Sequence, residues 1–206
     1  IKGTSESLAG RIAYLELTSF LLEEIEDNYE IDDLWFRGGF PDPFLQNSPW
    51  LEWMQNYIRT YVERDLPLLG FTAGRLLSER LWTMLAHNHG NLVNYSDIGK
   101  SLEISSSVIK KYLDFLESAF LIRQVRPYTN NMKKRIVKAP KVYIRDSGLL
   151  HYLLGLEDFN DLFGHIKMGA SWEGFVFEQI ANRLQANRKL FFYRTHDGSE
   201  LDLVIE

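Results

Sequence analysis

The segments GRLLSERLWTMLAHNHG (74–90), YSDIGKSL (95–102) and SSSVIKKYLDFLESAF (105–120) decide the fold, because each has apolar residues at helical spacing. Two strand-like segments follow them, LIRQVRPY (121–128) and VYIRD (142–146). Three helices followed by a two-stranded wing are the order of a winged helix-turn-helix. The sequence therefore predicts this module in the middle of the chain.

The third helix has two different faces in this prediction. Its expected buried face consists of Ile109, Leu113, Leu116 and Phe120. In a winged helix the third helix enters the major groove and the wing contacts phosphates, so polar and basic side chains at these places are the candidate DNA contacts. They are Ser106, Ser107, Lys110, Lys111, Lys133, Lys134, Arg135 and Lys138. Winged helices also serve as protein–protein modules, which is the alternative.

Charge is segregated along the chain. The net charge is −5, yet residues 118–145 hold eight basic and no acidic side chains, whereas residues 1–65 hold five basic and 13 acidic ones. A basic segment in an acidic protein concentrates positive potential where an anionic partner such as DNA binds. Alternatively, the basic segment pairs with an acidic neighbouring domain.

The composition excludes several classes of protein. The 206 residues are 45% hydrophobic and 25% charged, which is typical of a folded domain rather than a disordered chain. The absence of cysteine excludes a disulfide scaffold, a thiolate nucleophile and a cysteine-bound metal. No apolar run approaches the roughly 20 residues of a membrane helix. A cytoplasmic protein without a membrane partner is expected.

The segments before the central module are expected to be mostly helical. RIAYLEL (11–17) predicts a strand, and the acidic LEEIEDNYEIDDL (22–34) predicts a helix. Ser48 and Pro49 are typical of a helix start, and the helix that follows places Trp50 and other aromatic residues on one face for core packing.

The last sixty residues contain a long helix and a hairpin. The helix ASWEGFVFEQIANRLQ (170–185) has Glu173 four residues before the apolar Phe177, and Glu178 on the face expected to meet solvent. The strands KLFFYRT (189–195) and ELDLVIE (200–206) form the expected hairpin. Before this region, Asp146 is expected to cap a short helix.

An inward Glu173 on a helix and Asp202 on the following hairpin are half of a two-carboxylate Mg²⁺ site. Such a site binds the metal through hard oxygen ligands and activates water against a phosphodiester. The alternative is that Glu173 only accepts hydrogen bonds from the backbone or from Arg194, because a buried carboxylate needs a partner.

Longer strings of residues resemble a known family. They include ESLAGRIAYLEL, RGGFPDPF, YIRTYVERDLPLL, PKVYIRDSGLL, GASWEGFVFEQI and FYRTHDGSELDLVIE. Together they resemble a widespread prokaryotic family of ATP-binding proteins, the DUF4143 family, over essentially the whole chain. Its members join an N-terminal AAA-type ATPase domain to a C-terminal domain of unknown function.

The resemblance implies a division of the chain. Residues 1–20 would be the tail of the ATPase domain, 21–70 a helical linker region, 71–146 the winged helix, and 147–206 a domain similar to restriction-endonuclease-like PD-(D/E)xK nucleases. The expected fold class is thus α+β and mainly helical, with a winged helix-turn-helix followed by a truncated α/β domain. The terminal segments indicate a piece of a longer protein.

The resemblance also implies site residues and cofactors. Glu173 and Asp202 match the helix glutamate and strand aspartate of the nuclease fold, as catalytic residues and Mg²⁺ ligands. That fold needs a following strand with Glu-x-Lys, and this chain ends first, so the fragment is expected to be inactive as a nuclease. ATP and Mg²⁺ are implied for the parent ATPase. This fragment lacks a phosphate-binding loop, so it is expected to hold no ATP, and Mg²⁺ at the nuclease-like site is the one cofactor that it could bind. Arg11 would lie near the nucleotide, although an ordinary surface pair explains it as well.

Two functions follow from these observations. The first is a DNA-binding accessory region of an AAA-type ATPase, with an incomplete nuclease-like domain. The second is a protein-interaction or oligomerisation module of that ATPase with no nucleic-acid role. The expected partners are DNA, the protein's own ATPase domain and a second copy of the chain.

Overall fold

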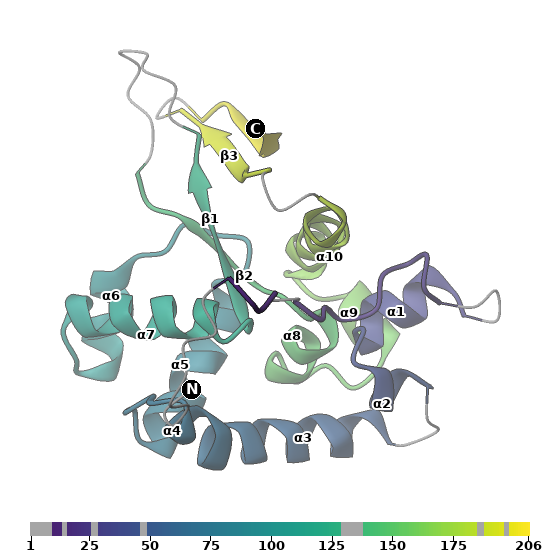
Figure 1. Ribbon diagram of the computed structural model, residues 1–206, viewed down its shortest axis with the longest axis horizontal. Helices are drawn as coiled ribbons and strands as arrows, with labels where there is room; N and C mark the ends of the chain where they lie inside the picture. Colours follow the sequence, from purple (N-terminus) through teal and green to yellow (C-terminus); the bar gives the residue numbers. More distant parts are fainter. Residues whose placement is uncertain are drawn as a thin grey trace.

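The computed structural model follows the expected order of helices and strands in the middle of the chain, and Figure 1 shows their arrangement. It describes residues 10–13, 16–25, 29–45, 49–128, 138–184, 188–195 and 198–206. The helical elements are α1 Ile31–Arg37, α2 Pro41–Leu45, α3 Trp50–Thr60, the π-helical turn η1 Tyr61–Asp65, α4 Leu66–Leu68, α5 Arg75–His87, α6 Tyr95–Leu102, α7 Ser106–Ser118, α8 Ser147–Leu153, α9 Phe159–Phe163 and α10 Met168–Arg183. The strands are β1 Ile122–Pro127, β2 Lys141–Ile144, β3 Leu190–Arg194 and β4 Glu200–Ile205.

A mixed four-stranded sheet in the order β2-β1-β3-β4 joins the middle and the end of the chain. β1 and β2 are antiparallel, as are β3 and β4. β1 runs parallel to β3 but pairs with it only at Arg126–Phe191 and Pro127–Phe192. The α+β class is confirmed, and one sheet crosses the expected division at residue 146.

Helices α5, α6 and α7 lie together on one side of the β1–β2 hairpin (Figure 1). Ser105 caps α7 by accepting a hydrogen bond from the backbone N–H of Val108. Ile109, Leu113 and Leu116 are buried, as predicted. The prediction for Phe120 is wrong, because α7 ends at Ser118 and Phe120 has a φ of 61° and is 58% exposed.

The N-terminal expectations are only partly right. Residues 10–13 and 16–20 form no strand, so the strand predicted at 11–17 is absent from the described residues. In the acidic segment, the described residues 22–25 and 29–30 are not helical, contrary to the prediction, and α1 begins at Ile31. The helix after Pro49 is confirmed, since α3 buries Trp50 and Met54. None of the helices in the described ranges has the length and apolarity needed to cross a bilayer.

The strings RGGF and RDSG pack against each other where α1 meets α8. Asp146 caps α8 as predicted, accepting from the N–H of Leu149 at 2.8 Å, and it also accepts from the N–H of Gly39 at 2.9 Å. Burial raises the pKa of Asp146 to about 6, although these hydrogen bonds oppose the rise. A Cβ on Gly38 would lie 2.7 Å from an oxygen of Asp146, so only glycine fits there. The two motifs therefore hold the linker region against the end of β2.

Candidate functional site

Three carboxylates converge on one buried ammonium group. Lys141 Nζ on β2 lies 3.2 Å from Glu173 Oε1 on α10, 2.7 Å from Glu200 Oε1 and 3.0 Å from Asp202 Oδ1, the last two on β4. The Lys141 side chain is only 5% exposed. The sheet and the helix on its face thus bring together the two residues that the sequence singled out, Glu173 and Asp202.

The cluster keeps Lys141 charged. Burial alone would lower the pKa of Lys141, but the hydrogen bonds to Glu200, Asp202 and Glu173 outweigh burial and raise it above its ordinary value. The hydroxyl of Tyr143, two residues along β2, donates to Glu173. Burial and this hydrogen bond raise the pKa of Tyr143. Glu173 therefore accepts from two neighbouring side chains of β2.

Glu173 has a partner that the sequence did not predict. Arg194, the predicted alternative, lies 3.4 Å from Glu200 instead. Lys141 was counted only as part of the basic segment. It lies two residues before Tyr143 and so shares a face of β2 with it, but all four residues of β2 are buried and no alternation in the sequence signalled this.

The donor set is suited to Mg²⁺ only in part. Glu173 and Asp202 offer the oxygen ligands that Mg²⁺ prefers, and the Asp202 side chain is 60% exposed. However, Lys141 lies within hydrogen-bond distance of both, so an ion would have to share their oxygens with the ammonium. Within the described ranges, no three Asp, Glu or His side chains are grouped to hold a metal.

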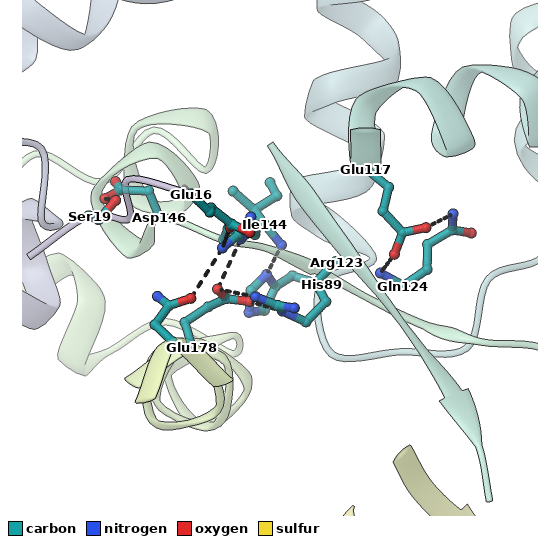
Figure 2. Close-up of polar contacts among 11 residues, drawn as sticks. Glu16, Ser19, His89, Glu117, Arg123, Gln124, Ile144, Asp146 and Glu178 are labelled. Carbon is teal, nitrogen blue, oxygen red and sulfur yellow. Dashed lines mark hydrogen bonds and ion pairs between the residues drawn. The ribbon is translucent and has the colours of Figure 1, made fainter. Parts of the chain in front are cut away.

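A second ionic cluster involves Glu178, whose predicted exposure is wrong. Figure 2 shows Glu178 between α10 and the β1–β2 hairpin, where its side chain is only 6% exposed. It accepts from Arg123 at 2.5 and 2.9 Å and from Arg145 Nε at 3.0 Å. Arg145 also contacts Glu16 at 2.6 Å. Two cations of the basic segment are therefore neutralised inside the protein.

The predicted DNA-contact residues that the structure describes lie on the surface. Ser106, Ser107, Lys110 and Lys111 are exposed on the first two turns of α7, and Lys138 is exposed before β2. A hollow of about 620 Å³ is lined by Ser106, Ser107 and Lys110, with residues 92–96 and Ala139 opposite. Lys133, Lys134 and Arg135 lie outside the described residues.

The predicted nucleotide-proximal residue, Arg11, is exposed. The described residues place it in a turn before the segment that leads to α1. Among the described residues, no hydrogen bond or ion pair joins Arg11 to another of the predicted site residues.

The comparisons with known proteins concern family membership. The family model of a domain of unknown function (DUF8612) matches residues 28–160. The chain belongs to this family. Beyond the DUF8612 region, the model of a second domain of unknown function (DUF4143) matches residues 168–206, which confirms the predicted resemblance to DUF4143 for that part.

Relatives of this DUF8612 chain are longer proteins. It is 43% identical over 204 residues to an uncharacterised protein of Mycobacterium tuberculosis and to one of Mycobacterium bovis, covering 98% of this chain and 46% of each relative. An uncharacterised protein of Haemophilus influenzae is 30% identical over 148 residues, covering 69% of this chain and 36% of the relative. The chain thus spans less than half the length of these relatives. No solved structure matches it.

Proposed function

We propose that this chain is the DNA-binding region of a longer, AAA-type ATPase, and that it contacts duplex DNA as a winged helix through α7. The observation that carries the proposal is the exposed start of α7. Ser106, Ser107, Lys110 and Lys111 face solvent there while the opposite face of α7 lies in the core. Hydroxyls and cations at a helix N-terminus suit phosphate, and a polar helix face suits base edges.

The test is fluorescence anisotropy of labelled duplex DNA across a salt series. Replacing Lys110 and Lys111 with glutamate should weaken binding by more than about tenfold and lower the salt slope by about 2, since each lost phosphate contact removes about 0.9. Replacing Arg59 and Arg80, exposed on α3 and α5, with glutamate changes net charge equally and should leave much of the binding intact.

A separate variant tests the wing. Lys133, Lys134 and Arg135 replaced with glutamate should reduce the salt slope further if the wing contacts phosphates. The DNA proposal would be contradicted if the wild type binds no duplex DNA, or if the α7 variant and the wing variant both bind it as tightly as wild type does. The protein-interaction or oligomerisation module would then be the better account.

The convergence of Glu173, Asp202 and Lys141 favours a second activity for the same protein, a nuclease-like site. Mg²⁺ held by Glu173 and Asp202 would activate water against a phosphodiester. Lys141 would then hold both carboxylates in position, and its charge would attract the phosphate. Tyr143 would orient Glu173 through its hydroxyl.

The full-length protein should therefore cleave DNA in a Mg²⁺-dependent manner. Glu173→Gln and Asp202→Asn should each lower the rate by more than about 100-fold, since losing even an outer partner of a metal ligand costs 10- to 100-fold. Glu157→Gln, an exposed residue beyond α8, is the matched control. Cleavage that persists in both variants would contradict the assignment of the nuclease-like site. The DNA-binding proposal would stand, because it rests on α7 and not on these carboxylates.

A further inference from the structure

A second hollow lies where β1 and β3 separate. The two strands share only the pairs at Arg126 and Pro127, so the earlier part of β1 has no strand beside it on that edge. A hollow of about 620 Å³ occupies this gap, between the end of α10 and the start of β3. Its size is in the range of ligand-binding pockets.

The acidic side chains around this hollow already have partners. Glu117 accepts from the backbone N–H of Gln124 at 2.8 Å and from its side-chain amide at 3.0 Å, so it caps the open edge of β1. Glu16 pairs with Arg145. Glu16 is therefore neutralised, whereas Glu117 keeps its negative charge, because both groups that donate to it are neutral.

Three cations around the hollow are unpaired. Arg126, Arg188 and Lys189 are exposed in its lining, and none forms an ion pair with a carboxylate of the described residues. Arg123, also in the lining, is neutralised by Glu178. Because Glu117 offsets one of the three, the hollow retains a net charge of about two positive units, in a protein whose net charge is −5.

The wall of the hollow is apolar and partly aromatic. Val125, Leu184 and Leu190 line it together with Phe191. The Phe191 ring is half-buried and is held edge-on by Tyr128 with ring centroids 5.6 Å apart. A fixed aromatic ring beside unpaired cations is the combination that binds a base and its flanking phosphates.

We propose that this groove between β1 and β3 binds a single polynucleotide strand, with Arg126, Arg188 and Lys189 on its phosphates and Phe191 stacked on a base. A mobile single strand suits the groove better than a duplex, because its bases can leave the stack and reach an aromatic ring. The groove is separate from the start of α7, so it goes beyond the duplex contact proposed above.

The test is anisotropy of fluorescein-labelled oligo-dT and oligo-rU, which distinguish DNA from RNA as the source of the strand. A triple variant should lower the slope of log affinity against log salt by about 2, because each lost phosphate contact on a single strand removes about 0.7. It combines Arg126→Ala, Arg188→Ala and Lys189→Ala. Phe191→Leu, which keeps the wall apolar, should weaken binding about 5- to 100-fold through lost stacking. Circular dichroism and urea unfolding establish that each variant is folded.

Two controls separate this proposal from the first. The first control is a variant that removes the same charge elsewhere and should bind oligo-dT as wild type does. It replaces Arg59 on α3, Arg64 on η1 and Arg80 on α5 with alanine. The Lys110/Lys111 glutamate variant should keep oligo-dT binding whether or not it loses duplex binding. No binding of either oligonucleotide by wild type, or groove variants that bind as tightly as wild type, would overturn the inference. Equal loss in the α7 and groove variants would overturn it as well.

Discussion

Gly148→Ala is expected to destabilise the protein by about 3 kcal/mol or more, at the upper end of the cost of overpacking a core. A Cβ at position 148 would lie 2.8 Å from the backbone nitrogen of Gly38 and closer still to the carbonyl of Arg37. These are backbone atoms at the end of α1, so no side chain can rotate away to make room. Urea unfolding followed by tryptophan fluorescence measures the loss, because Trp35 lies in α1.

Gly169→Ala is the matched control. Gly169 lies in α10, and a Cβ there would meet no atom within 4 Å. Alanine should therefore be tolerated at this position in the first turn, with a change in stability of less than about 1 kcal/mol. An unfolding free energy of Gly148→Ala within 1 kcal/mol of wild type would show that α1 and α8 are not held together as the structure has them.

Lys141→Met is expected to cost about 3 kcal/mol of stability. The change keeps an apolar stem near the ring of Phe192, which the ammonium overlies at 5.6 Å, but it leaves three carboxylates facing one another. Removing one partner of a buried ion pair costs about 3–5 kcal/mol, and the exposure of Asp202 places this case at the lower end. The measurement is again urea unfolding.

Two further variants check the cause. Lys138→Met removes an exposed cation just before β2 and should change stability by less than about 0.5 kcal/mol. Adding Glu173→Gln to Lys141→Met should recover part of the loss, because one of the uncompensated carboxylates disappears. A loss below 1 kcal/mol in Lys141→Met, or no recovery in the double variant, would contradict the role of Lys141 as the centre of the cluster.

Local patterns were reliable where one element decides the outcome. The three helices and the following strands, the cap at Asp146 and the buried face around Leu113 were all confirmed, because helical spacing and capping involve residues within a few positions of each other. The prediction that Phe120 is buried was wrong for a local reason as well, since α7 ends two residues before it.

Charge was the least reliable guide, because a count does not show which cations are free. The basic segment 118–145 suggested eight cations for an anionic partner. Arg123 and Arg145 bind Glu178, and Lys141 binds three carboxylates. All of these acidic partners lie at least 28 residues outside the basic segment in the sequence, so only a folded chain reveals the pairing.

The sequence by itself determined the order of helices and strands in residues 74–146 and of the terminal helix and hairpin. It also determined the exposed start of α7 and the choice of Glu173 and Asp202, since periodicity and side-chain type suffice for these. The tertiary structure decided that Lys141 lies between those two carboxylates, that Glu178 is buried, and that β1 and β3 diverge around a basic groove. These features depend on strand pairing and on helix packing across the sheet. Such contacts join residues far apart in the chain and leave no periodic trace within any one segment.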